Sequence, residues 1–193
     1  MRSTRLSNRL LYVVGPSGSG KDSIMAFARA QLAGQPMVQF AHRYITRPAD
    51  SGGENHIALS QAEFNARIQA GLFAMHWHSH GNSYGIGAEI NQWLSRGITV
   101  VVNGSREYLP QAMQNYPELL PVTIEVAHDV LKARLMQRAR ESEAEIDARI
   151  SRNMILQLSH PAGITVSNNG SLEDAGAALV NLIEQHSKVT LCE

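Results

Sequence analysis

The residues from Gly15 to Ser23 have the types and the spacing of a loop that binds polyphosphate. They match the pattern G-x-x-x-x-G-K-S/T except at its last position, and read Gly15-Pro16-Ser17-Gly18-Ser19-Gly20-Lys21-Asp22-Ser23. The glycines let successive backbone N–H groups curl around an anion, and the lysine is placed to reach the β- and γ-phosphates. We predict that these residues bind a nucleoside triphosphate and that Lys21 is a catalytic cation.

The segments on either side of this loop are those that the pattern requires. The apolar run Leu10–Val14 precedes it and predicts a strand, and Asp22–Leu32 predicts a helix. The positive end of that helix would point at the same anion. A glycine-rich turn with a chance lysine is the alternative, and the preceding strand argues against it.

Asp22 stands where this pattern has the Ser or Thr whose hydroxyl normally holds Mg²⁺. Magnesium is a hard cation that favours oxygen ligands and keeps several waters. We therefore predict that Asp22 binds the metal, directly or through a water. The alternative is an aspartate at a helix start that interacts only with the helix dipole.

Composition limits the class of protein. The chain has 193 residues, which suits one domain, and 17 basic residues balance 17 acidic ones. The charge does not call for a nucleic-acid or membrane partner, and no run approaches the ~18 apolar residues of a membrane span. Cys192 is the only cysteine, which fits a reducing cytoplasm. We predict a cytoplasmic protein, and the oligomeric state is left open.

The rest of the chain alternates strands and helices. Further strands are predicted over Met37–His42, Phe73–His80, Ile98–Val102, Val122–Val126 and Ile164–Ser167. Helices are predicted from a capping box at Ser60 to Gly71, and over Glu89–Arg96, Val130–Arg140, Ser142–Leu158 and Leu172–His186. Thr46–Glu54 is predicted as a loop and Gly81–Gly87 as a glycine-rich turn. The alternation predicts an α/β fold whose parallel sheet is covered on both faces, with ligands at the carboxyl ends of its strands.

Together these pieces resemble the guanylate-kinase-like branch of the nucleoside monophosphate kinases, over about Leu10 to Ile183. Besides the glycine-rich loop, the matching segments are Ile45-Thr46-Arg47-Pro48, Gly53-Glu54-Asn55-His56, Gly71-Leu72-Phe73, Gly81-Asn82-Ser83-Tyr84-Gly85, Val100–Val102 and Arg134–Arg149. The resemblance implies a P-loop three-layer fold with a central parallel sheet, in one domain over residues 1–193. It also implies an acceptor-binding region at about 43–87 and a lid at about 134–150.

The resemblance implies roles for several cationic and phenolic side chains. Arg47, in the Thr-Arg-Pro segment, is expected to bind the acceptor phosphate, and Arg43 a second phosphate. Tyr84 resembles the phosphate-binding tyrosine of the family, and Arg138 and Arg149 resemble lid arginines that close over the donor phosphates. The alternatives are an exposed strand-end arginine, a half-buried turn tyrosine and a solvated helix face.

Two other groups of polar residues are candidates for weaker roles. His76, His78 and His80 alternate, so their side chains share one face of a strand and could ligate zinc. A polar pocket lining or plain surface is the favoured interpretation. Asn168 and Asn169 resemble the donor-adenine region of the family.

The departures from guanylate kinases concern the recognition of a base. Met75 stands where they place a guanine-reading glutamate, Ile86 replaces their Ser or Thr, and Asn103-Gly104-Ser105 replaces the Asp-x-Asp that ends a core strand. Their second acceptor-phosphate arginine falls on Asp50. A glutamate that accepts hydrogen bonds from guanine cannot be replaced by methionine without losing that recognition. The parts that hold phosphates therefore persist, while those that read a base are lost.

This profile resembles the branch of the family that phosphorylates ribose 1,5-bisphosphate in phosphonate breakdown, whose loop carries the same aspartate. The resemblance implies that ATP, with Mg²⁺, and ribose 1,5-bisphosphate give 5-phosphoribosyl diphosphate and ADP. One alternative is a guanylate or other nucleoside monophosphate kinase with a rearranged base pocket. Another is a non-catalytic guanylate-kinase-like interaction module, although such modules commonly lose the loop that is intact here.

Overall fold

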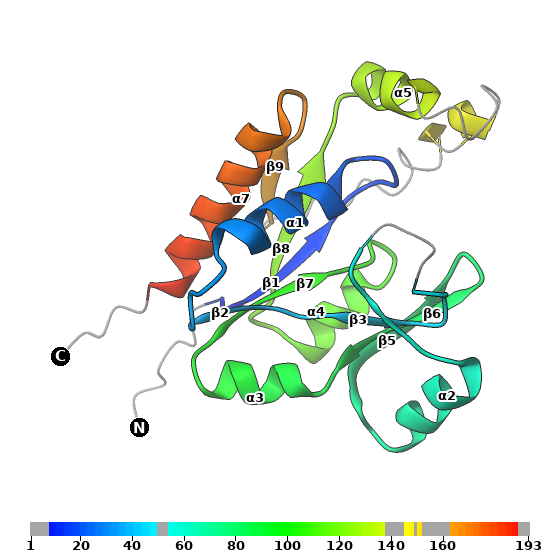
Figure 1. Cartoon of the computed structure of the whole chain (residues 1–193), viewed down its shortest axis with the longest axis vertical. Helices are drawn as coiled ribbons and strands as arrows, with labels where there is room; N and C mark the ends of the chain where they lie inside the picture. The colour runs from blue at the N-terminus through cyan, green and yellow to red at the C-terminus, as the bar shows by residue number, and fades with distance from the viewer. Residues whose placement is uncertain (1–7, 50–53, 138–144, 149, 152–162, 189–193) are drawn as a thin grey trace.

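The computed structural model describes residues 8–49, 54–137, 145–148, 150–151 and 163–188. Its centre is a five-stranded sheet in the order β2-β7-β1-β8-β9, in which every neighbouring pair is parallel (Figure 1). The strands are β1 (Leu10–Val14), β2 (Val38–Phe40), β7 (Thr99–Asn103), β8 (Leu120–Glu125) and β9 (Ile164–Ser167). The predicted parallel α/β sheet is therefore confirmed.

Helices cover both faces of this sheet. The side chains of β1 point alternately to one face and to the other, and each set packs against different helices. Leu11 and Val13 point into a core cluster with α1 (Lys21–Gln31) and α7 (Leu172–Ser187). Leu10, Tyr12 and Val14 point into a second cluster, which includes residues of α3 (Glu89–Ser95) and α4 (Leu109–Asn115). Both faces of β1 are buried, which accounts for its unbroken apolar run.

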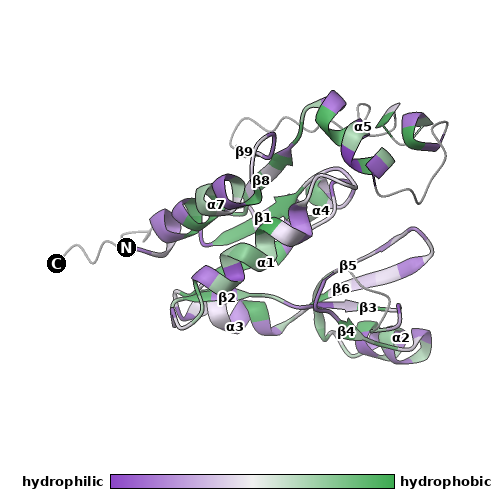
Figure 2. Cartoon of the chain, turned by 45° about the horizontal axis from the view of Figure 1, so that its top comes forward, coloured by the Kyte–Doolittle hydropathy of each residue, from purple (hydrophilic) through white to green (hydrophobic). Residues whose placement is uncertain are grey.

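A second sheet stands beside the first, in the order β4-β3-β6-β5 (Figure 2). It consists of β3 (Arg43–Ile45), β4 (Ile57–Ala58), β5 (Phe73–Ser79) and β6 (Asn82–Gly87). The helix α2 (Gln61–Gln69) begins at Ser60, whose hydroxyl accepts a hydrogen bond from Glu63 N at 3.1 Å, as the capping box predicts. Phe64 of α2 packs on Phe73 of β5, with ring centroids 4.7 Å apart.

The prediction of a turn over Gly81–Gly87 is wrong. Only His80 and Gly81 turn the chain, with φ of 49° and 74°, and Asn82–Gly87 is β6, antiparallel to both β5 and β3. The glycines here serve packing instead, since a Cβ on Gly85 would stand 2.6 Å from the ring of Phe73. Pairing with two neighbouring strands therefore overrides the local preference of a glycine-rich segment for a turn.

The strand predicted over Met37–His42 is shorter than expected. It ends at Phe40, after which Ala41 N still donates to Val101 O at 2.9 Å. The chain then leaves the central sheet, and Arg43–Ile45 pairs with β6 in the second sheet. The strand β3 and the helix α4 are additions to the predicted elements.

The helix α5 (His128–Gln137) begins the region predicted as a lid. Leu131 and Leu135 of α5 form a small apolar cluster with Ile146 and Ile150. The helix predicted over Ser142–Leu158 lies mostly outside the described residues. No helix among the described residues is long and apolar enough to cross a lipid bilayer.

The contact between α1 and α7 yields a prediction about stability. Alanine in place of a helical glycine normally stabilises by about 0.5–1 kcal/mol. At Gly176, however, a Cβ would stand 2.7 Å from Cγ of Phe27. We expect Gly176→Ala to lower the free energy of unfolding by about 1–3 kcal/mol through overpacking, as measured by urea denaturation. The same change in a Phe27→Leu background should be tolerated better, and stabilisation by Gly176→Ala alone would contradict the packing argument.

Candidate active site

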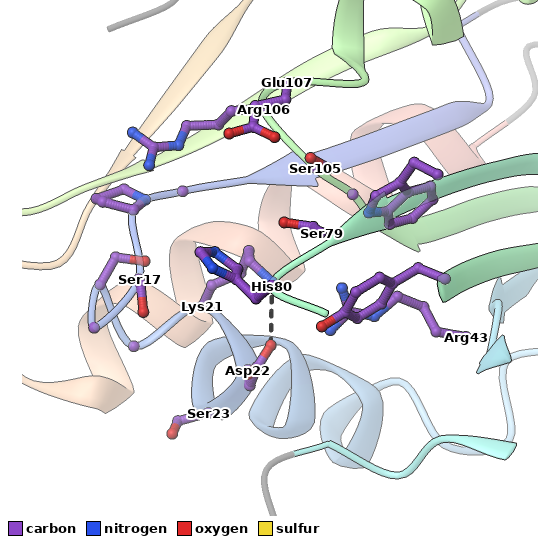
Figure 3. Close-up of a pocket in the computed structure, with 18 residues that line it drawn as sticks. Ser17, Lys21, Asp22, Ser23, Arg43, Ser79, His80, Ser105, Arg106 and Glu107 are labelled. Carbon is purple, nitrogen blue, oxygen red and sulfur yellow. Dashed lines mark hydrogen bonds and ion pairs between the residues drawn. The ribbon is translucent and has the colours of Figure 1, made fainter. Parts of the chain in front are cut away.

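A cavity of about 720 Å³ opens at the carboxyl ends of β1 and β7, where the sequence predicts the ligands to gather. All the predicted loop residues, Gly15–Ser23, line one side of it. The other lining residues come from the second sheet and from the segment after β7, and they are Arg43, Trp77, Ser79, His80, Tyr84, Gly104, Ser105, Arg106 and Glu107 (Figure 3). The fold therefore places Arg43 and Tyr84 across the cavity from the glycine-rich loop.

The loop has the backbone geometry of a phosphate cradle. Gly18 and Gly20 adopt φ of 92° and 83°, and Ser19 N donates to Pro16 O at 3.0 Å. The first N–H groups of α1 have no partner within the helix and form an anion site at its start. Among the described residues nothing hydrogen-bonds the buried hydroxyl of Ser19. These features fit the phosphates of a nucleotide.

The side chain of Asn168 supports the glycine-rich loop through a hydrogen bond to the loop backbone. Its side chain is buried, and Nδ2 donates to Ser19 O at 2.6 Å. Asn168 N donates to Glu125 O at 2.7 Å, which ties the loop to the end of β8. A Cβ on Gly20 would stand 2.5 Å from Asn168 Nδ2. The sequence associates Asn168 with the adenine region, whereas its amide supports the phosphate loop in the structure.

Lys21 and Asp22 form a polar network with the buried side chain of Asn103, the last residue of β7. The side chain of Lys21 is 13% exposed and that of Asp22 is 46% exposed. Lys21 Nζ lies 3.1 Å from Asp22 Oδ1 and also donates to Asn103 Oδ1, while Asn103 Nδ2 donates to Asp22 Oδ1 at 2.9 Å (Figure 3 shows the ion pair). Burial lowers the pKa of Lys21 below its usual value, and the Asp22 carboxylate opposes this shift. Burial alone would raise the pKa of Asp22, but Lys21 and Asn103 outweigh it and the pKa is lowered. Asp22 is therefore ionised at neutral pH and is chemically suited to a divalent cation.

Arg43 lies in the wall of the cavity and is not an exposed strand-end residue. Its Nε donates to Glu54 Oε2 at 2.8 Å, its Nη2 donates to Glu54 Oε1, and both side chains are 12% exposed. The guanidinium also lies over the ring of Tyr84, 5.1 Å from its centroid. Tyr84 stacks on Trp77 with 5.6 Å between centroids, so it is a strand residue in an aromatic stack and not a turn residue. Glu54 and the stack thus orient both side chains.

The other arginines predicted for the site are Arg47, Arg138 and Arg149, and none of them is among the residues that line the cavity in the described part of the chain. Arg47 follows β3, is half-buried, and its carbonyl oxygen lies 3.1 Å from His56 Nε2. It does not line the cavity that Arg43 and Tyr84 line. Arg138 and Arg149 lie outside the described residues.

Several residues of the site could not be recognised as such in the sequence. Glu54 lies within a matching motif that predicts no role for it, and Asn103 indicates only the loss of a carboxylate. Arg106 and Glu107 come from a segment without a predicted element, and they lie across the cavity from Asp22 (Figure 3). A polar side chain at the carboxyl end of a buried strand was the signal that could have indicated Asn103.

The three alternating histidines differ in their relation to the cavity. All three side chains are exposed, but only His80 is among the residues that line the cavity. Within the described parts of the chain, no group of three or more His, Cys, Asp or Glu could hold a metal ion. The favoured interpretation, a polar lining or plain surface, fits these positions.

A phosphate cradle that faces an ordered arginine across a cavity is the arrangement of a P-loop kinase, which brings two anionic substrates together. The guanylate kinase family model matches residues 7–186. The fold is similar to the crystal structure of guanylate kinase from Anaplasma phagocytophilum, with a TM-score of 0.65 and 14% identity over 94% of this chain and 87% of that one.

Two curated relatives are far more similar in sequence, and both are named ribose 1,5-bisphosphate phosphokinase PhnN. The protein from Desulfomicrobium baculatum is 54% identical over 176 residues, which are 91% of this chain and 94% of that one. The protein from Thiobacillus denitrificans is 53% identical over 177 residues, 91% of this chain and 92% of that one. The chain therefore belongs to the guanylate kinase family, in the group of the ribose 1,5-bisphosphate phosphokinases, which confirms the resemblance seen in the sequence.

The phosphate cradle yields a prediction for Lys21. We expect Lys21→Ala to abolish phosphoryl transfer, because losing one charge that stabilises the transition state costs on the order of 3 kcal/mol or more. The measurement is ADP release by variants whose folding is verified by circular dichroism. Lys188→Ala, at the exposed end of α7, is the matched control and should leave turnover unchanged. Near-normal turnover of a folded Lys21→Ala protein would remove the argument.

Proposed function

We propose that the protein transfers the γ-phosphoryl group of ATP to ribose 1,5-bisphosphate, giving 5-phosphoribosyl diphosphate and ADP in phosphonate breakdown. The names of the relatives support this proposal, and so does one observation on this chain. The phosphate loop is intact, while two positions that guanylate kinases use to read a base carry apolar side chains in the core.

Those positions are Met75 and Ile86, which are 1% and 0% exposed. Both pack in the second core cluster, together with Tyr12. Neither side chain carries a carboxylate or hydroxyl that could bind the polar edge of guanine, and neither lines the cavity. The cavity wall instead presents groups such as Ser79, His80 and Arg106, which suit a phosphorylated sugar without a base.

The chemistry requires positioning and charge neutralisation. An oxygen of the acceptor phosphate attacks the γ-phosphorus in line, and the bond from that phosphorus to the β-phosphate oxygen breaks. The attacking oxygen is already anionic at neutral pH, so no general base is needed. Lys21 would hold the donor phosphates. Arg43 would hold an acceptor phosphate, because Glu54 occupies Nε and Nη2 and the guanidinium has further N–H donors.

The other proposed site residues complete the neutralisation. Tyr84 would position the acceptor beside Arg43, and Arg47 would bind an acceptor phosphate once the substrate is present. Arg138 and Arg149 would close over the donor phosphates. Asp22 would hold Mg²⁺, and bound Mg²⁺ would neutralise charge on the β- and γ-phosphates.

The proposal includes the organisation of the chain. Residues 1–193 would form one kinase domain, with the second sheet in an acceptor-binding region at about 43–87 and a lid at about 134–150. The substrates are small molecules, and no nucleic-acid or membrane partner is proposed. We propose the cytoplasm as the location, since a chain whose only cysteine is Cys192 suits a reducing compartment.

A comparison of acceptors tests the reaction. We measure ADP release from Mg·ATP with ribose 1,5-bisphosphate, GMP or AMP, and identify the diphosphate product by phosphorus NMR. We expect kcat/KM for the sugar bisphosphate to exceed that for GMP by on the order of a hundredfold or more, because Met75 and Ile86 stand at positions where guanylate kinases read the base. An authentic guanylate kinase with GMP is the control for the assay. Equal or faster turnover of GMP would refute the proposal.

The role of Asp22 is tested by its Mg²⁺ dependence. We expect Asp22→Asn to need several-fold more Mg²⁺ for half-maximal turnover. Each fivefold change in this concentration corresponds to about 1 kcal/mol in the free energy of Mg²⁺ binding. Asp22→Ser should need less than Asp22→Asn, because it restores the hydroxyl of the common loop. Asp129→Asn, which removes a first-turn acidic residue from α5, controls for helix-dipole effects. An unchanged Mg²⁺ requirement in Asp22→Asn would leave Asp22 as a helix-start residue.

A further inference from the structure

Asn103 is a buried amide with a charged group on each of its polar atoms. It is 4% exposed at the end of β7. Its Oδ1 accepts from the ammonium of Lys21, and its Nδ2 donates to Asp22 Oδ1 at 2.9 Å and to Glu54 Oε2 at 3.0 Å. The neighbours determine the orientation of the amide, because an ammonium can only donate to it and the carboxylates can only accept from it.

These contacts cross from one side of the cavity to the other. Lys21 and Asp22 belong to the loop and the first turn of α1, while Glu54 orients Arg43 in the second sheet. We propose that Asn103 is a positioning residue that holds the donor lysine and the acceptor arginine in register. We also propose that this position must carry a neutral amide, because Asp22 and Glu54 face it. The inference rests on the proposed function for the assignment of the donor and acceptor sides.

No other side chain of this size can make the same contacts. An aspartate would offer an acceptor to Lys21 but no donor to the two carboxylates, and it would add a third negative charge beside them. Leucine would leave Lys21 and Asp22 without their shared partner. Lys21 and Glu54 have side chains that are only 13% and 12% exposed, and a largely buried charged group that loses a hydrogen-bond partner carries a desolvation penalty, so the position requires an amide.

The requirement follows from the residue at position 22. In guanylate kinases a hydroxyl follows the loop lysine and a carboxylate ends this strand, whereas this chain has Asp22 and Asn103. The two side chains are in direct contact, so a carboxylate at one position excludes a carboxylate at the other. Asn103→Asp should therefore be harmful when residue 22 is Asp, and the harm should diminish when residue 22 is Ser. Repulsion between two carboxylates would also lower the stability of the fold, so the unfolding temperature is measured beside the activity.

The experiment compares Asn103→Asp, Asn103→Ala, Asp22→Ser and the double variant Asp22→Ser/Asn103→Asp. Asn115→Asp makes the same chemical change on the exposed end of α4 and is the matched control. The readouts are kcat and KM for ribose 1,5-bisphosphate, calorimetric binding of Mg·ADP, and the unfolding temperature. We expect Asn103→Asp and Asn103→Ala to lose about tenfold or more in kcat/KM, since each breaks a hydrogen bond to a charged group. The double variant should recover above Asn103→Asp.

Two results would overturn the inference. One is wild-type kcat/KM in Asn103→Asp, and the other is a folded double variant no better than Asn103→Asp. If Asn103→Asp does not fold, the loss in Asn103→Ala and the activity of the double variant relative to Asp22→Ser decide the question. Binding of Mg·ADP needs no acceptor, and its affinity should rank the variants in the same order as kcat/KM does. Failure of the wild type on ribose 1,5-bisphosphate would therefore refute the proposed function while leaving the inference open to this readout.

Discussion

The burial of β1 on both faces is the constraint on which the site depends. The strand lies between β7 and β8 and ends directly at Gly15, so the sheet determines where the phosphate loop begins. Tyr12 of the same strand also positions the opposite wall, since its hydroxyl accepts from Ser105 N at 2.9 Å. A Cβ on Gly104 would stand 2.7 Å from Cδ1 of Tyr12 and closer still to two other atoms of its ring, so a glycine is required there. One buried strand thereby orders both sides of the cavity.

The second sheet supplies what the central sheet lacks, a rigid surface that faces the loop. Arg43 reaches the cavity because β3 leaves the plane of the central sheet and pairs with β6. The stack of Trp77 on Tyr84 and on Tyr108 then joins this sheet to the segment that follows β7. This wall of the cavity, the proposed acceptor side, is therefore held by packing.

The central sheet and the phosphate loop could be predicted because their signals are local. Buried parallel strands are continuous β-branched runs, and the loop is a contiguous motif with one substitution. The second sheet was only partly predicted, because β6 is stabilised by cross-strand pairs such as Trp77 and Tyr84 and not by its own composition. The polar network was missed for the same reason, since Asp22, Glu54 and Asn103 come from three distant segments. The assignments of Arg138 and Arg149 stay predictions.

The charges around the cavity are balanced before any substrate is present. Lys21 lies against Asp22, Arg43 pairs with Glu54, and Glu107 interacts electrostatically with Arg106. Buried charges need such partners, because an isolated one would carry a large desolvation cost. Lys21 and Arg43 are thus each held in place by a carboxylate, and an incoming phosphate would meet side chains whose conformational entropy was already lost on folding. The balance also means that an anionic nucleotide finds little excess positive charge in these pairs. The Mg²⁺ that we propose to bind with the nucleotide would supply that charge.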